Sequence, residues 1–426
     1  MLPRLSSIFV LTLFGAGCGP QESGPAPAPS GTGAQGGSGG SAIAGASGAA
    51  GSTGGIGGGA GGAGGSGGSA GSVSLGGSAG TGGSAGSGQG GMFTDPGTDG
   101  DGDFTLQPPY QSSPLNDPGG APVGQQLAFT MSSVDSAIYP GVDGSFTRNV
   151  WVYVPSQYVA GTPAPFIVVQ DGHYAVWFGT DIPHAPNFDG PNLPGTANLP
   201  LILDNLISQG KLPPIVALFV QSGPGDGEGS DRGLEYDTVS GTFAEFVDAE
   251  VLPKAASEVQ TQLGIDLAFT EDPRGRATLG GSSGAAASFS MAWWHPELFG
   301  LVIAYSGTFV RQASPEDPDF PHGCWAYHDF DPYDPATPDG VIVQEPTTKP
   351  LRIWLEVGEN DLGANGGPDT YRDFPLANQR MAASLAAKGY HYHFDFAEGA
   401  GHLDGGVVAQ TLPDALLWLW RGYPLQ

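Results

Sequence analysis

The sequence predicts an α/β fold, in which a mostly parallel sheet carries helices on both of its faces. Short continuous apolar runs, typical of strands buried on both sides, alternate with helical patterns from about residue 126 onward. This alternation is typical of parallel strands joined by right-handed crossovers. The N-terminal part lies outside this fold, because residues 31–91 contain 30 of the 73 glycines and no charged residue lies between Glu22 and Asp95.

The expected strands and helices are placed by their patterns along the chain. Strands are expected at residues 147–155, 165–172, 215–220, 276–279, 301–305, 351–355 and 390–396. Helices are expected at residues 201–209, 242–262, 285–294, 376–388 and 412–420. Pro253 lies inside the longest helix and predicts a kink or a break, because proline lacks the N–H that a helix interior needs. Functional side chains are expected outside the C-terminal ends of the strands.

These patterns divide the chain into three parts. We expect a signal peptide at residues 1–18, a disordered Gly/Ser/Ala-rich linker ending in an acidic spacer at residues 19–104, and one large folded domain at residues 105–426. The linker has almost no large apolar side chains, so it cannot bury enough surface to offset its backbone entropy. The spacer does not match a calcium loop, because Phe104 and Tyr110 stand where an EF-hand needs Gly and Glu.

The first eighteen residues have the features of an export signal. Arg4 is followed by the apolar run Leu5–Phe14, which is too short to span a bilayer, and then by small residues and Cys18. This ending resembles a bacterial lipobox. We therefore expect Cys18 to be lipidated and the protein to be a lipoprotein of the bacterial cell envelope, at the outer membrane or cell surface; the alternative is a secreted protein with an ordinary cleaved signal. Cys324 then has no disulfide partner and is expected to be a buried free thiol.

Charge and cysteine content exclude several classes of partner. The chain has 14 Lys and Arg against 42 Asp and Glu, a formal net charge of −28. Nucleic acid and anionic lipid need clustered cationic side chains, so neither is expected, and contact with a membrane is expected only through a lipid anchor. Two cysteines cannot form a disulfide scaffold or a four-cysteine zinc site. No cofactor and no metal site are expected.

A candidate nucleophile lies in the run Gly280–Gly284, which fits the pattern G-x-S-x-G. The Gly-rich linker also contains this pattern by composition alone, at residues 36–40 and 64–68, so the context decides. At Ser282 the pattern follows an expected strand and precedes an expected helix, as in a nucleophile elbow. The amide of Ser283, at a helix N-terminus, could then face a developing oxyanion. The hydroxyl of Ser283 is the rival nucleophile, one residue off the pattern.

A serine nucleophile needs a base and an orienting carboxylate, which follow in the order Ser, acid, His in α/β-hydrolases. His402 lies in a Gly-rich loop directly after the expected strand 390–396 and is the candidate base. Asp361 lies in the turn after the strand that begins at Leu351 and is the candidate acid. Glu359 is the alternative acid, and Asp361 could instead cap the next segment through its side chain.

These segments together resemble the esterase D / enterochelin-esterase-like branch of the α/β-hydrolases. The resemblance rests on the runs Val169–Tyr174, Arg276–Gly284, Pro296–Gly300 and Tyr305–Gly307, and it extends from about Phe129 to Tyr423. It implies an α/β-hydrolase fold and hydrolysis of a carboxylic ester through an acyl-enzyme. Relatives in this branch act on siderophore lactones, on feruloyl or acetyl carbohydrate esters, or on S-formylglutathione, and some are acyltransferases.

The resemblance also assigns roles to residues of this chain. It implies Ser282 as nucleophile, Asp361 as acid and His402 as base. One oxyanion donor would be the amide of Ser283, and the other would come from the turn near Gly172 or His173. The commoner elbow of this family has Met and a second Gly after the nucleophile, where this sequence has Ser283 and Ala285.

Four further side chains are expected to line the substrate site. The segment His322–His328 is rich in aromatic residues, and a loop with Trp325 and His328 over the site fits better than a metal site, because no second cluster completes four ligands. Arg232, Glu235 and Tyr236 either line the site or pair with each other. The expected substrate is a small-molecule, carbohydrate or siderophore ester. The alternatives are an acyltransferase of the same fold and a surface binding protein without catalysis.

Overall fold

The computed structural model describes residues 96–142, 144–173, 197–225, 229–312, 317–329 and 339–425. These residues belong to one compact unit, Ser84–Gln426. The expected signal, Cys18 and the linker up to residue 95 lie outside the described residues, as does Tyr174. No helix within the described ranges is both long enough and apolar enough to cross a membrane.

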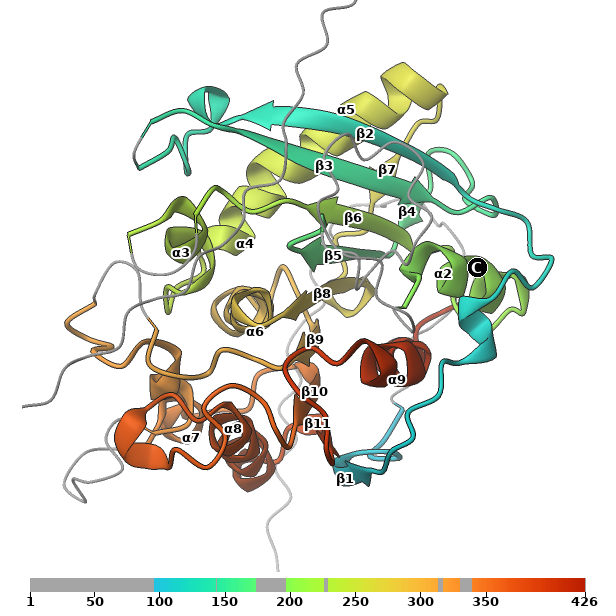
Figure 1. The fold of residues 1–426 in the computed structure, drawn as a ribbon. Coiled ribbons are helices and arrows are strands. Elements are labelled where there is room, and N and C mark those ends of the chain that lie inside the picture. Colours follow the sequence, from blue (N-terminus) through green and yellow to red (C-terminus); the bar gives the residue numbers. More distant parts are fainter. Residues whose placement is uncertain are drawn as a thin grey trace, which may run out of the picture. The chain divides into compact units, whose positions relative to one another are not determined.

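The centre of the domain is a nine-stranded sheet in the order β1-β11-β10-β9-β8-β5-β6-β3-β2 (Figure 1). Its strands are β1 (Gly102–Leu106), β2 (Gln125–Ser132), β3 (Thr147–Val154), β5 (Phe166–Gln170), β6 (Val216–Val220), β8 (Arg276–Gly281), β9 (Leu301–Tyr305), β10 (Arg352–Gly358) and β11 (His391–Ala397). Neighbouring strands are parallel except that β3 runs antiparallel to both β6 and β2. A separate two-stranded sheet pairs β4 (Pro163–Ala164) with β7 (Ala268–Phe269). The mostly parallel sheet predicted from the sequence is confirmed.

Helices cover both faces of the large sheet (Figure 1). One face packs on α2 (Leu199–Ser208) and α9 (Gly405–Leu419). The other face carries α3 (Asp231–Tyr236), α4 (Thr242–Phe246), α5 (Leu252–Leu263), α6 (Ser283–Trp294), α7 (Val341–Gln344) and α8 (Phe374–Lys388). The apolar faces of the helices therefore enclose the strands from both sides, which explains why the central strands read as continuous apolar runs.

The helix expected at residues 242–262 is interrupted. Its first turn is α4, a π-helical turn follows at Val247–Val251, and α5 begins at Leu252. Pro253 occupies the first turn of α5, where its missing N–H costs least. The kink or break expected near Pro253 takes the form of this π turn, across which the backbone keeps right-handed helical dihedral angles.

The strand β1 lies across the boundary that the sequence placed between spacer and domain. Gly102–Leu106 pairs in parallel with His393–Ala397 of β11 and forms one edge of the sheet. The ordered fold therefore starts before residue 105. This strand was not predicted because its three central residues are exposed and carry no apolar pattern.

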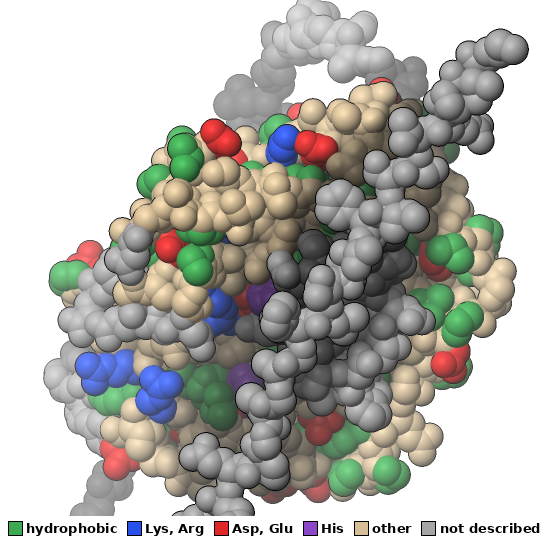
Figure 2. All heavy atoms as spheres, turned by 45° about the horizontal axis from the view of Figure 1, so that its top comes forward, with side chains coloured by type: hydrophobic (Ala, Val, Ile, Leu, Met, Phe, Trp, Pro, Cys, Tyr) green, Lys and Arg blue, Asp and Glu red, His purple; other side chains and the backbone are tan. Residues whose placement is uncertain are grey.

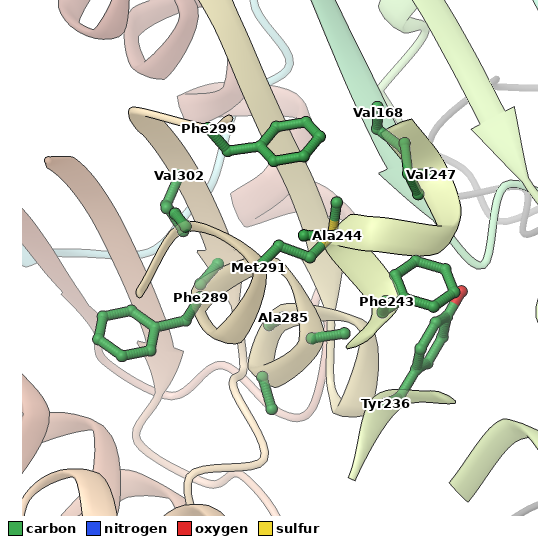
Figure 3. Packing of buried hydrophobic residues seen from close by; sticks show 14 of the residues in the cluster. Val168, Tyr236, Phe243, Ala244, Val247, Ala285, Phe289, Met291, Phe299 and Val302 are labelled. Atoms are coloured by element: carbon green, nitrogen blue, oxygen red, sulfur yellow. The ribbon is translucent and has the colours of Figure 1, made fainter. Parts of the chain in front are cut away.

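The helix α6 lies at the centre of the face that supports the candidate nucleophile. Its small residues, among them Ala285, bring the helix close to the sheet, while Phe289 and Met291 fill the space beside it (Figure 3). All three side chains are fully buried. This tight packing fixes the N-terminus of α6, and with it the turn that joins β8 to α6.

Candidate active site

Ser282 lies on the sharp turn between β8 and α6, as the G-x-S-x-G pattern predicts. Its backbone has φ of 57° and ψ of −127°, a strained conformation for a residue with a side chain. A Cβ atom on Gly280 would overlap the backbone of Gly284, so the turn can close only with glycine at that position. The N–H of Ser282 donates to Tyr305 O at 3.0 Å, which ties the turn to β9. The geometry is that of a nucleophile elbow at the C-terminal edge of the sheet.

His402 and Asp361 contact each other at the same edge. His402 Nδ1 lies 2.6 Å from Asp361 Oδ1, and the imidazole is 24% exposed while the carboxylate is fully buried. Asp361 Oδ1 also accepts the N–H of Leu362 at 2.6 Å. Glu359, the alternative acid, instead accepts the N–H of Gly399 at 2.8 Å and so ties the turn after β10 to the loop after β11. Of the two acids, Asp361 is the one that contacts the imidazole.

The loops that carry His402 and Ser282 pack against each other. Leu403, the residue after His402, donates its N–H to Ser306 Oγ at 3.0 Å, and its side chain lies against Gly281. The hydroxyl of Ser282 lies 3.3 Å from Thr308 Oγ1, and within the described residues no hydrogen bond joins Ser282 to His402. Catalytic hydrogen bonds are often long before substrate binds, so this geometry alone does not exclude Ser282 as a nucleophile.

Two backbone positions bear on an oxyanion site. Ser283 is the first residue of α6, where an N–H has no acceptor within the helix, and its hydroxyl accepts from Gln312 Nε2 at 3.1 Å. On the facing turn after β5, the N–H of Gly172 donates to Val220 O at 3.0 Å. The amide of Gly172 is therefore engaged in the sheet, and His173, the next residue on this turn, is the remaining candidate from the sequence. Burial lowers the pKa of the His173 imidazole below its usual value.

Three of the four expected substrate-lining residues are part of the core. Trp325 and Tyr236 are fully buried. His328 is 7% exposed and donates from Nε2 to Phe309 O at 2.9 Å. Cys324 is a buried free cysteine, as expected, and burial raises the pKa of its thiol. The aromatic segment thus packs inside the domain instead of lying over a pocket, a difference that residue types alone do not reveal.

Arg232, the fourth expected lining residue, is held in an ion pair. Its Nη2 lies 2.7 Å from Asp171 Oδ2, with both side chains nearly buried. Glu235, its neighbour on α3, pairs instead with Arg148 of β3 at 2.5 Å. The sequence left open whether Arg232, Glu235 and Tyr236 line the site or pair with each other; in the structure Arg232 and Glu235 instead form ion pairs with residues outside α3. Asp171, Arg148 and Thr308 were missed as partners because they are far from their contacts in sequence.

Histidine and cationic side chains both reach the surface on one face of the domain. Figure 2 shows them close together near the middle of one face, beside atoms drawn in grey. His402 and Ser282 are both half-buried, so part of each side chain is exposed at the surface of the described residues. The arrangement brings a candidate nucleophile, a carboxylate-paired imidazole and a helix N-terminus to one edge of the sheet.

Comparison with known proteins identifies relatives of this chain. The family model Esterase, described as "Putative esterase", matches residues 146–419. The iron(III) enterobactin esterase of Dickeya dadantii (strain 3937) is 29% identical over 286 residues, which cover 65% of this chain and 52% of that protein. The chain thus spans about half the length of the curated relative that it matches.

Solved structures similar to this chain include two kinds of esterase. An enterobactin esterase from Shigella flexneri is 18% identical, with a TM-score of 0.42 over 71% of this chain and 62% of that chain. A ferulic acid esterase from Anaeromyces mucronatus is 13% identical, with a TM-score of 0.43 over 72% of this chain and 94% of that chain. The matched residues of the family model include the strands β3 to β11 together with Ser282, Asp361 and His402. The family model thus matches more than half of the chain, which therefore belongs to the Esterase family.

Proposed function

We propose that the protein is a serine esterase in which Ser282 is the nucleophile, His402 the general base and Asp361 the residue that orients the imidazole. The observation that carries this proposal is the 2.6 Å contact between His402 Nδ1 and Asp361 Oδ1, on a loop packed against the elbow of Ser282. A carboxylate at Nδ1 fixes the tautomer that leaves Nε2 free to take a proton. Membership of the Esterase family supports the same reading.

The reaction would proceed through an acyl-enzyme. Ser282 rotates from Thr308 toward His402, transfers its proton to Nε2, and Oγ attacks the carbonyl carbon of the ester. The negative charge on the carbonyl oxygen is stabilised by the N–H groups of Ser283 and His173. The C–O bond to the alcohol then breaks as the alcohol takes the proton from His402. Water repeats the sequence, and the acid leaves with Ser282 restored.

The substrate class is proposed from the names of the relatives. An enterobactin esterase and a ferulic acid esterase are among them, which favours a small-molecule ester of siderophore type or an ester of ferulic acid. Turnover of a panel of such esters identifies the acyl and alcohol parts. Addition of acceptor alcohols to the same assays separates hydrolysis from acyl transfer, because a transferase forms new esters from them.

The catalytic assignment is tested by Ser282→Ala, with Ser283→Ala as the matched control. The first variant should lose turnover of a short-chain aryl ester and labelling by a fluorophosphonate probe, and keep the Tm of the wild type. The second removes only a hydroxyl that accepts from Gln312 and leaves the backbone N–H in place, so it should keep both activities. Full activity of Ser282→Ala in a pure preparation would reject the assignment. Loss of labelling in Ser283→Ala but not in Ser282→Ala would identify Ser283 as the nucleophile instead.

We also propose export and lipidation at Cys18, which lies outside the described residues. The apolar run before a cysteine that follows small residues supports this. Wild-type protein expressed in a bacterium should incorporate labelled palmitate and partition into detergent, and Cys18→Ser should do neither. Equal partitioning of the two proteins would contradict lipidation and favour an ordinary cleaved signal.

A further inference from the structure

The turn that follows β5 is held in an uncommon backbone conformation. Asp171 has φ of +49°, in the left-handed region that few residues other than Gly, Asn and Asp adopt. The next residue, Gly172, donates its N–H to Val220 O at 3.0 Å, and a Cβ at Gly172 would overlap the backbone of Phe219. These contacts fix the position of the turn relative to β6. On the opposite side, the position of the turn depends on the contacts that Asp171 makes.

Two side chains of α3 hold Asp171 from that other side. Arg232 Nε lies 3.1 Å from Asp171 Oδ1 and Arg232 Nη2 lies 2.7 Å from Oδ2, which makes a forked ion pair. Tyr236 accepts the backbone N–H of Asp171 with its hydroxyl oxygen at 3.0 Å. The Tyr236 ring packs edge-on against Phe243, with 5.2 Å between ring centroids (Figure 3). One short helix therefore binds both the carboxylate and the amide of Asp171.

The helix α3 is itself fixed in the core by further polar contacts. Glu235 accepts from both terminal nitrogens of Arg148, at 2.5 and 3.1 Å, and from the N–H of Gly223 at 2.8 Å. Asp231 accepts the N–H of Val142 at 2.8 Å. A helix of six residues is too short to be stable alone, so these contacts determine where it lies.

The turn held by Asp171 packs directly on α6, the helix that follows Ser282. A Cβ placed on Gly284, in the first turn of α6, would lie 3.4 Å from Asp171 Oδ2 and 3.0 Å from Gln170 Cβ. Ser282 precedes this helical turn. A shift at Asp171 therefore changes the position of His173 relative to Ser282, which is the relation that an oxyanion donor must keep.

We propose that Arg232 and Tyr236 are positioning residues that hold Asp171, and through it the N–H of His173, in the geometry that stabilises the oxyanion. This inference rests on the proposed serine esterase function. Because the oxyanion exists only in the transition state and its neighbouring intermediates, loss of this geometry lowers kcat and leaves KM unchanged. The two residues act through the turn and do not contact the substrate.

The test uses two conservative variants and one matched control. Tyr236→Phe removes only the hydroxyl that accepts from Asp171, and Arg232→Lys keeps the charge but cannot form the fork. Tyr158→Phe is the control, because Tyr158 also accepts a backbone N–H, from Ala268 at 3.0 Å, but beside the β4–β7 sheet. Measured on a short-chain aryl ester, kcat of the first two variants should fall about ten- to hundredfold, since small misplacements at a reacting centre have effects of this size.

Affinity for a transition-state mimic separates positioning from a structural role. An aryl boronic acid, which becomes tetrahedral on the serine, should bind the two variants more weakly by the same factor by which kcat falls. Tyr158→Phe should change neither quantity, whatever its Tm. If Tyr236→Phe leaves too little folded protein, Arg232→Lys gives the same comparison.

Three results overturn the inference. An unchanged kcat in both variants shows that the turn keeps its geometry without the contacts of Arg232 and Tyr236 to Asp171. A higher KM at unchanged kcat shows that these side chains serve substrate binding instead. A wild-type enzyme that turns over without labelling at Ser282 overturns the proposed function and this inference together, whereas normal labelling with unchanged kcat in the variants overturns the inference alone.

Discussion

Replacement of His328 by Gln should flatten the dependence of stability on pH below neutrality. His328 is 7% exposed, and burial, with a smaller effect of the Arg380 charge, lowers its pKa from 6.5 to about 3. Its Nε2–H donates to Phe309 O, and among the described residues no hydrogen-bond partner faces Nδ1, so a second proton would be buried without an acceptor. The folded protein therefore keeps this imidazole neutral while the unfolded chain takes up a proton.

The sign and size of the effect follow from this difference in pKa. A group whose pKa is lowered by folding contributes stability that is present above its unfolded pKa and is lost as the pH falls. The loss begins near pH 6.5 and continues toward about pH 3. One pKa unit corresponds to about 1.4 kcal/mol, so the wild type should lose about 2 kcal/mol from this group between about pH 7.5 and about pH 5.0. The variant should lose none of this amount, although its lost ring contacts lower its stability at all pH values.

Urea denaturation followed by tryptophan fluorescence measures this difference. The quantity compared is the change in the free energy of unfolding between the two pH values, for wild type and His328→Gln. His391→Gln is the matched control, since the His391 side chain is 39% exposed and the same substitution is made there. Equal pH dependence of wild type and His328→Gln would refute the reasoning and show that His328 is not held neutral by its burial.

Three further predictions concern buried groups near the site. Glu235→Gln should lower the free energy of unfolding by about 3–5 kcal/mol, because it leaves the Arg148 charge buried without its partner. Replacing Arg148 and Glu235 together by apolar residues should recover most of this loss. Urea denaturation measures both changes. Burial raises the pKa of Glu356 well above its usual value, so its stabilising contribution is present below about pH 4.5 and is lost as the pH rises. Glu356→Gln should therefore raise the Tm at about pH 8 more than at about pH 4. An equal change in Tm at the two pH values would count against this prediction. Thr308→Val should speed fluorophosphonate labelling of Ser282 a few-fold, since one net hydrogen bond of about 1 kcal/mol no longer holds the hydroxyl; slower labelling would show that Thr308 supports the reactive rotamer.

The central strands could be predicted from the sequence because a strand that is buried on both faces consists almost entirely of apolar residues. Residues 301–305 were expected and found as β9, and the strand expected at 276–279 extends to Gly281 as β8. The edge strand β1 carries no such run, because its exposed residues meet water. The first turns of α9 were missed for another reason: they contain Gly405 and Gly406, and their start is fixed by Asp404, whose carboxylate accepts two backbone N–H groups.

The candidate site could be predicted where its residues follow strands. Ser282 directly follows β8, and Asp361 and His402 lie in the loops that follow β10 and β11, so the parallel topology brings all three to one edge. Side chains that contact this edge from elsewhere leave no local signal. Thr308 is a plain threonine after β9, and the choice of His173 over Gly172 depends on a hydrogen bond to β6 that only the assembled sheet forms.

The two buried ion pairs at α3, Arg148–Glu235 and Arg232–Asp171, are not explained by a gain in stability. Replacing a buried ion pair by apolar residues of similar size is often neutral or stabilising, because two charges must leave water to form it. A forked pair such as Arg232–Asp171 provides a defined geometry, which an apolar contact provides less well. Through Arg148 and Glu235, the antiparallel strand β3 is connected to α3, and through α3 to the turn after β5. Replacing Arg232 by Leu and Asp171 by Asn together removes both charges and keeps at position 171 a residue that tolerates the left-handed conformation, so it should lower the Tm only slightly and still lower kcat. Such a separation of stability from activity is what positioning requires; a parallel loss of both would mean that the pair serves packing alone.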